Sequence, residues 1–187
     1  VLKSGNNFTD GINLYENAIV DVTDNTDTAG ATNIASGTLN INARKTFETS
    51  ALENNGLVNL KGILDTSSIN GDGTLNIQNA KAKVYGDVLG NTLGFEKVKT
   101  NLSSIFYGDL ENVGFDLTSS TLTIDKDVSL VDINMEKSTL NLTDDLTAGG
   151  DLDANASTLN LGTNKLTVDN VYLRGKSNIN LSVEGKE

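Results

Sequence analysis

Apolar and polar residues alternate in short segments that recur along the whole chain. In the segment 74–77, which reads Thr-Leu-Asn-Ile, Leu75 and Ile77 face one way while Thr74 and Asn76 face the other. This is the period-2 pattern of a half-buried strand. Similar tetrapeptides occur at 38–41, 121–124, 139–142 and 158–161, with a looser copy at 178–181. We expect each of these segments to be a β-strand.

The spacing of the copies predicts how the strands are arranged. The anchor residues Leu122, Leu140, Leu159 and Ile179 follow one another at about 18 to 20 residues, a period typical of stacked coils that bury their apolar faces against their neighbours. An antiparallel meander would need a tight turn such as Asn-Gly at matching positions, and no such turn recurs in register. We therefore predict an all-β fold, a right-handed parallel β-helix (β-solenoid) of roughly 18–20-residue coils. About nine coils would form a rod on the order of 45 Å long.

One stretch departs from this pattern. Segments 19–22 and 57–60 fit the register, and 92–95 fits it less well. Between 94 and 116 the apolar residues also suit one face of a helix, so we expect an irregular coil or insertion there: a bulged coil, an inserted loop or a short helix. No linker divides the chain, so we expect a single domain over 1–187. Because repeat proteins normally carry atypical capping elements, both ends resemble cuts through a longer array, and we expect a fragment of a longer protein.

The composition suits a narrow core and excludes some partners. Hydrophobic residues make up 37% of the chain and aromatic residues 5%, which fits a thin core of Leu, Ile and Val. The net charge of −11 and the scattered basic residues argue against nucleic acid and anionic membranes, since phosphate binding needs clustered Lys and Arg. No run approaches the roughly 18 apolar residues of a membrane helix.

Missing residue types narrow the possible catalytic chemistry. The chain has no His and no Cys, which excludes Ser-His and thiolate nucleophiles. The segments 25–27 and 144–145 superficially resemble two motifs of polygalacturonase-like glycosidases, but many coils separate them. A lyase of this fold would need a basic residue beside carboxylates, and Arg174 has no acidic cluster near it in sequence. We therefore predict no catalytic residues and no enzyme activity.

A calcium loop is the strongest candidate metal site. The segment 68–73 places oxygen-bearing side chains at alternate positions and a glycine at the sixth, as an EF-hand loop does, but the twelfth position is Asn79 instead of Glu. A turn with glycines at positive φ accounts for Gly71 and Gly73 equally well. We predict no metal site and no cofactor.

The outward column of the repeated tetrapeptides is the one extended surface that the sequence specifies. If the copies stack in register, their polar side chains form ladders along one face, which could bind a glycan, a protein or a second copy of the rod. Stacked Thr and Asn side chains that only stabilise the coils are the alternative explanation. Tyr85, Tyr107 and Tyr172 could stack on sugars or fill corners of the core. The candidate binding residues are Thr38, Asn40, Thr74, Asn76, Thr121, Thr123, Thr139, Asn141, Thr158 and Asn160.

The segments 138–142 and 157–168 carry a resemblance to a known family. Their Ser/Thr-Leu-Asn-Leu repeats, in a chain without Cys, resemble the passenger region of Gram-negative autotransporter adhesins (type V secretion). The resemblance implies a right-handed β-helix displayed at the cell surface, secreted through a C-terminal outer-membrane barrel that lies outside this chain. Such passengers serve adhesion, self-aggregation or biofilm formation; filamentous haemagglutinin-like exoproteins and phage tail fibres use similar coils.

These expectations lead to one functional hypothesis and two alternatives. The hypothesis is a non-catalytic adhesin on the surface of a Gram-negative bacterium, whose partner is a host or bacterial surface protein or glycan, possibly the protein itself. The alternatives are a β-helix polysaccharide lyase or glycoside hydrolase, and a purely structural stalk.

Overall fold

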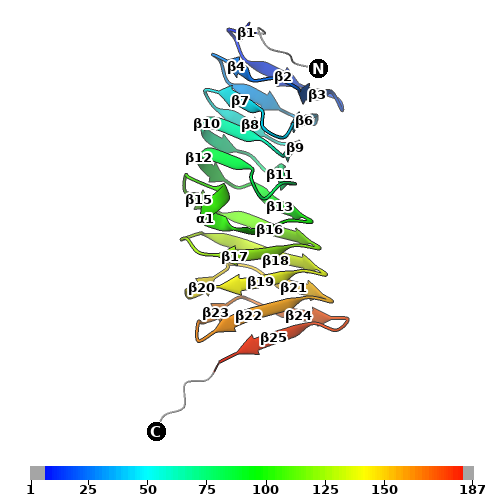
Figure 1. Ribbon diagram of the computed structural model, residues 1–187, viewed down its shortest axis with the longest axis vertical. Coiled ribbons are helices and arrows are strands. Elements are labelled where there is room, and N and C mark those ends of the chain that lie inside the picture. Colours follow the sequence, from blue (N-terminus) through cyan, green and yellow to red (C-terminus); the bar gives the residue numbers. More distant parts are fainter. Residues whose placement is uncertain (1–6, 183–187) are drawn as a thin grey trace.

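The computed structural model describes residues 7–182, and these form a rod of stacked parallel coils (Figure 1). Sheet A runs the whole length of the rod and contains nine strands, one from each coil, all paired in parallel. The predicted parallel β-solenoid is therefore confirmed. The strands of sheet A are β3 (Ile19–Val22), β6 (Thr38–Ile41), β9 (Leu57–Leu60), β11 (Thr74–Ile77), β13 (Thr92–Glu96), β16 (Val113–Thr118), β18 (Leu130–Glu136), β21 (Leu152–Asn155) and β24 (Val171–Arg174).

The remaining sides of the rod differ between its two halves. Sheet B belongs to the N-terminal half, where two rows of short strands merge in the long strands β10 and β12. It contains β1 (Asn7–Phe8), β2 (Ile12–Leu14), β4 (Thr26–Thr28), β5 (Thr32–Ile34), β7 (Thr46–Thr49), β8 (Leu52–Asn54), β10 (Ile63–Asn70), β12 (Lys83–Leu89) and β15 (Leu110–Glu111). Sheets C and D belong to the C-terminal half. Sheet C contains β14 (Lys99–Asn101), β17 (Thr121–Ile124), β19 (Thr139–Leu142), β22 (Thr158–Gly162) and β25 (Asn178–Leu181), and sheet D contains β20 (Leu146–Thr147) and β23 (Leu166–Thr167).

The change from sheet B to sheets C and D takes place in a widened coil. Within 94–116 lie β14 and the short helix α1 (Leu102–Ile105), which the sequence offers as one of three possibilities. Paired strand residues of adjacent coils are 22 positions apart here, against 17 to 21 elsewhere. Phe95, Phe106 and Phe115 fill the wider interior, with ring centroids 6.4 and 5.7 Å apart in edge-to-face contacts. The extra residues thus widen the core at mid-rod.

Columns of identical or similar apolar residues form the core. Leu122, Leu140 and Leu159 stack in register on sheet C and are fully buried, and Ile179 continues the column. Each fully buried leucine contributes about 2 kcal/mol through the hydrophobic effect. The predicted stacking of anchor residues is confirmed.

A column of serines marks the corner between sheets A and C. The Oγ atom of Ser138 accepts a hydrogen bond from the amide of Ser120 at 3.1 Å, and Ser157 and Ser177 repeat this contact with the serine one coil earlier at 3.0 and 3.1 Å. The residues directly before Ser120, Ser138 and Ser157 have φ near +50°, a left-handed conformation that turns the chain sharply. The serine hydroxyls therefore satisfy amides that the turn leaves without a strand partner.

Candidate functional site

The ten candidate binding residues do not form one face, which corrects the prediction from the sequence. Those of β6 and β11 lie in sheet A, whereas those of β17, β19 and β22 lie in sheet C. Before the widened coil, the repeated tetrapeptide is itself the strand of sheet A. After it, the tetrapeptide comes next in the chain after the sheet A strand and belongs to sheet C, on another side of the rod. Sheet A holds Thr38, Asn40, Thr74 and Asn76, and sheet C holds Thr121, Thr123, Thr139, Asn141, Thr158 and Asn160.

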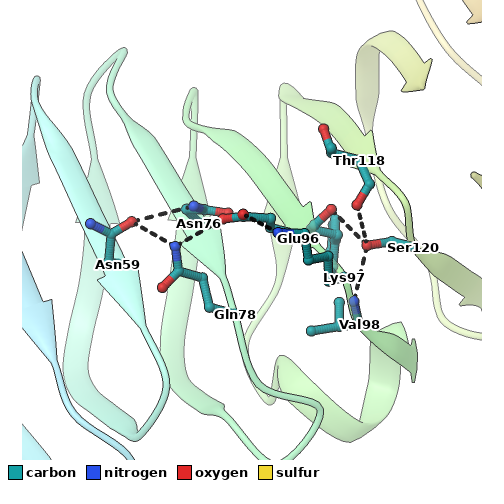
Figure 2. Close-up of polar contacts among 9 residues, drawn as sticks. Asn59, Asn76, Gln78, Glu96, Lys97, Val98, Thr118 and Ser120 are labelled. Atoms are coloured by element: carbon teal, nitrogen blue, oxygen red, sulfur yellow. Dashed lines mark hydrogen bonds and ion pairs between the residues drawn. The ribbon is translucent and has the colours of Figure 1, made fainter. Parts of the chain in front are cut away.

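On sheet A, the asparagines form a hydrogen-bonded ladder between coils. The Nδ2 atoms of Asn40, Asn59 and Asn76 each donate to the residue one coil earlier, at 2.7, 2.9 and 3.3 Å. Figure 2 shows the end of this ladder, where Gln78 donates to Asn59 at 3.3 Å and to Glu96 at 3.0 Å. The next position in the column is Gly94, which has no side chain to continue it.

On sheet C, a second ladder runs toward the C-terminal end. Asn141 donates to the Oγ1 atom of Thr123 at 3.3 Å. Asn160 and Asn180 each donate to the side-chain oxygen of the asparagine one coil earlier, at 2.7 Å. A carboxamide has two amide protons, so each asparagine keeps one for an external partner. Both ladders therefore present rows of polar groups that are already held in place.

The structure brings Arg174 together with carboxylates that are distant in sequence. Its Nε atom donates to the carboxylate of Asp153 at 3.2 Å, and its Nη2 atom forms an ion pair with the same group. Both residues line a shallow groove of about 320 Å³ on sheet A that also contains Asp116 and Glu136. The expectation that Arg174 lacks an acidic cluster holds for the sequence but is wrong for the folded rod, because 21 residues amount to one coil.

The electrostatics of this groove favour a permanently charged arginine. The hydrogen bond that Arg174 donates to Asp153, with the attraction of the Asp153 charge, raises the pKa of the Arg174 guanidinium above its usual value. Hydrogen bonds from Lys137 and Asn155 lower the pKa of Glu136. At neutral pH both groups are ionised, so they can bind charged or polar ligands.

A larger groove of about 780 Å³ lies between β15 and β20, and we call it the acidic groove. Its carboxylates come from three successive coils and are Asp109, Glu111, Asp125, Asp127, Asp144 and Asp145. Of these carboxylates, only the pair 144–145 stood out in the sequence. The others carry a signal that could have been found, since Asp109, Asp127 and Asp145 are separated by about one coil each.

Three of the groove carboxylates accept hydrogen bonds from backbone amides. This is the role of aspartates in turns, which the sequence suggested for the pair 144–145. Asp144 accepts from the amide of Asp145 at 2.8 Å, and Asp145 accepts from the amide of Lys165 at 2.7 Å. Asp125 accepts from the amide and hydroxyl of Ser103 at 2.8 and 2.6 Å. Partial burial raises the pKa of Asp125, but the Ser103 hydrogen bonds act in the opposite direction and together hold it below the usual value.

The other sequence candidates lie apart from both grooves. The segment 25–27 lies in and next to β4 near the N-terminal end, so the fold does not bring it to Asp144. Gly71 has a φ of +111°, as expected for the turn. Gly73 is required for a different reason, because a Cβ atom there would lie 2.6 Å from the carbonyl oxygen of Asn54. Across residues 7–182, no three His, Cys, Asp or Glu side chains are placed to hold one metal ion.

The tyrosines lie on the surface and do not fill the core. Tyr85 and Tyr107 stack with ring centroids 4.7 Å apart, and the Nζ atom of Lys83 lies 4.6 Å from the centroid of the Tyr107 ring. The hydrogen bond to the Tyr107 hydroxyl raises the pKa of Lys83. Tyr172 is half exposed on sheet A.

Comparison with models of protein families, with curated proteins and with solved structures gives no match. In the described part of the chain, no helix has the length and apolar character needed to cross a membrane.

Proposed function

We propose that this chain is part of a bacterial cell-surface adhesin, a passenger-type β-solenoid that binds a surface protein or glycan, or another copy of itself, without catalysing a reaction. The observation that carries the proposal is the pair of ladders on sheets A and C. Their asparagines are fixed by hydrogen bonds between coils, so a partner that docks on them loses little conformational entropy of the rod. The repeated polar groups suit a partner that is itself extended or repetitive.

The resemblance to autotransporter passengers supports the location that we propose, outside a Gram-negative cell. A rod of stacked coils holds its faces rigidly along its length, because every strand of sheet A between β3 and β24 is paired on both sides by its neighbours. Such a shape suits a protein that must present a binding face away from the cell surface.

Cell attachment by face variants tests this proposal. Thr121→Lys, Thr139→Lys and Thr158→Lys together place three long cations on sheet C, and the matched variant carries Thr38→Lys, Thr74→Lys and Thr92→Lys on sheet A. Beads coated with the parent chain should adhere to epithelial or bacterial cells, and one of the two variants should lose most of this adhesion. Full adhesion by both variants, or none by the parent, contradicts binding through the ladders.

A polysaccharide-active enzyme is the second candidate, and the groove that contains Arg174 and Asp153 is the observation in its favour. The raised pKa of Arg174 opposes its use as a general base at neutral pH, which is why we prefer binding to catalysis. Release of new chain ends from polygalacturonate or alginate, abolished by Arg174→Gln, would support the enzyme. A stalk without a ligand would show neither adhesion nor turnover.

A further inference from the structure

Basic residues that are scattered in the sequence come together at one corner of the rod. This corner is the row of turns that lead from sheet A to sheet B, from β6 to β7, from β9 to β10 and from β11 to β12. We call it the basic corner and define it by Arg44, Lys61, Lys81 and Lys83. The first three are exposed and lie one in each turn, and Lys83 is the first residue of β12.

The register of sheet B places these cations on successive coils. The first residues of β7, β10 and β12 are paired with one another across the three strands, which follow one another along one side of the rod (Figure 1). Arg44, Lys61 and Lys81 each lie two positions before one of those first residues. Because neighbouring strands are about 4.8 Å apart, the backbone positions of the three cations span about 10 Å along the rod.

Contacts between the turns hold the corner together. The Nδ2 atom of Asn79 donates to the carbonyl of Lys61 at 3.0 Å, and its Oδ1 atom accepts from the amide of Lys81 at 2.9 Å. One side chain thus joins two of the turns. At Gly62, a Cβ atom would lie 2.2 Å from the carbonyl oxygen of Lys45 in the previous turn. The cations are therefore carried by a closely packed backbone.

Carboxylates near the basic corner have other partners. In the described part of the chain, none of the four residues of the corner forms an ion pair. Asp24, in the equivalent turn one coil earlier, pairs with Lys45 at 3.1 Å. Glu96, one coil later, accepts a hydrogen bond from Gln78 at 3.0 Å and pairs with Lys97 at 3.6 Å (Figure 2). The corner therefore keeps its positive charge available in a chain whose net charge is −11.

Two stacked tyrosines adjoin the basic corner. The Nζ atom of Lys83 donates to the hydroxyl of Tyr107 and lies 4.6 Å from the centroid of the Tyr107 ring. The rings of Tyr85 and Tyr107 stack with centroids 4.7 Å apart, and Tyr107 is 51% exposed. An exposed aromatic ring offers a flat apolar surface, against which the apolar face of a sugar ring can pack. Positive charge and aromatic surface thus occur side by side.

We propose that the basic corner binds an anionic polysaccharide, whose sulfate or carboxylate groups contact the cations and one of whose sugar rings packs on Tyr107. Cations that recur from coil to coil suit a ligand whose negative groups also recur, because the charges of the two surfaces are then complementary. The inference goes beyond the proposed function, because it concerns a surface outside both ladders.

The surroundings of the corner favour a polysaccharide over nucleic acid. Glu48 and Asp65 border the corner on sheet B, where they are paired in one row. They and the overall negative charge of the rod repel a polyanion in proportion to its charge density, which is high in nucleic acid. A polysaccharide with fewer charges per unit length is repelled less and still contacts the cations.

Binding of a labelled glycan tests the proposal. The probe is a fluorescent heparin octasaccharide, which carries both sulfate and carboxylate groups, measured by fluorescence anisotropy at moderate salt. The corner variant combines Arg44→Gln, Lys61→Gln and Lys81→Gln, three exposed side chains without an ion pair among the described residues. It should bind the probe at least about tenfold more weakly than the parent. No binding of the probe by the parent overturns the proposal.

The matched control removes the same number of positive charges elsewhere. Lys137→Gln, Lys165→Gln and Lys176→Gln are exposed in the C-terminal half of the rod and give the same net charge as the corner variant. The control should bind the probe within about twofold of the parent, since charges beyond the Debye length are screened. An equal loss in both variants overturns the proposal, because the overall charge of the chain would then explain the change.

A further variant separates recognition of sugar from recognition of charge. Tyr107→Ala keeps every charge and should weaken binding of the octasaccharide at least about threefold, because the packing surface for the sugar ring is lost. Inorganic polyphosphate has no ring to pack, so its binding should not change. Equal competition with the octasaccharide by polyphosphate, by single-stranded DNA or by phosphatidylserine vesicles overturns the proposal in favour of a site for negative charge alone.

A carboxylate-only probe identifies the anionic group. An octamer of galacturonate that binds as well as the heparin octasaccharide assigns the site to carboxylates, and binding of heparin alone assigns it to sulfates. Glycan binding by a rod that does not adhere to cells would support the basic corner and contradict the adhesin, because the corner and the ladders are different surfaces.

Discussion

Replacing Ser138 by alanine should remove one contact from the serine column at the corner of the rod. The Ser138 hydroxyl accepts the amide of Ser120 at 3.1 Å and donates to the carbonyl of Glu136 at 2.9 Å, and both serines are only 4% exposed. The substitution leaves the Ser120 amide buried without an acceptor. A buried unsatisfied amide costs about 1 to 3 kcal/mol, and the lost hydrogen bond to the carbonyl adds about 1 kcal/mol. We expect the free energy of unfolding to fall by about 2 to 4 kcal/mol.

Urea unfolding followed by far-ultraviolet circular dichroism measures this loss. Ser119→Ala is the matched control, because the Ser119 side chain is exposed one residue away and its φ of +51° is equally unfavourable for alanine and serine. The control should change stability by no more than about 0.5 kcal/mol. Because coils can open locally, amide hydrogen exchange at Ser120 gives a second, residue-level reading. If Ser138→Ala is as stable as the control and Ser120 stays equally protected, the serine column does not contribute as argued.

Four further substitutions test the roles of single residues. Gly73→Ala should destabilise the rod by about 2 kcal/mol or more, because the new Cβ would lie 2.6 Å from carbonyl oxygens of the previous coil. Gly162→Ala, where nothing lies within 4 Å, should cost only about 1 kcal/mol for its φ of +62°; equal urea midpoints would contradict the steric argument. Ala156→Gly should stabilise by about 0.5 to 1 kcal/mol, because glycine adopts its φ of +50° without strain, and a lower thermal midpoint would count against this. Since the folded pKa of Asp125 is lowered, its stabilising contribution is present above the unfolded value of about 3.9 and is lost as pH falls through the folded value. Asp125→Asn should therefore remove part of the loss of stability that occurs as pH falls below about 4, and parallel pH profiles of the two chains in that range would refute the role of the Ser103 hydrogen bonds.

The stacking of the core could be predicted from the sequence, whereas the sides of the rod could not. Leu39 and Leu140 have the same local pattern around them, and both are fully buried. They belong nevertheless to different sheets, because β14 and α1 shift the following tetrapeptides to a new side. A period-2 pattern states which residues of a strand face inward, but it carries no information on which side of a coil the strand lies.

The candidate sites show the same division. Arg174 and Asp153 are 21 residues apart and contact each other directly, and the acidic groove collects carboxylates from three coils. A one-coil spacing points to such neighbours once the coil length is known. Local coil length, however, varies from 17 to 22 residues, so spacing alone does not identify which side chains meet.

The amino-acid sequence alone determined the repeat, the β character of the coils and the identity of the buried column, because alternation within a strand and repetition between coils are local properties. The tertiary structure alone decided that the polar ladders occupy two sheets and that the acidic groove forms between β15 and β20. These features depend on how a widened coil displaces every strand that follows it. Three phenylalanines fill the interior of that widened coil, and its effect on the later strands is not encoded in any single repeat.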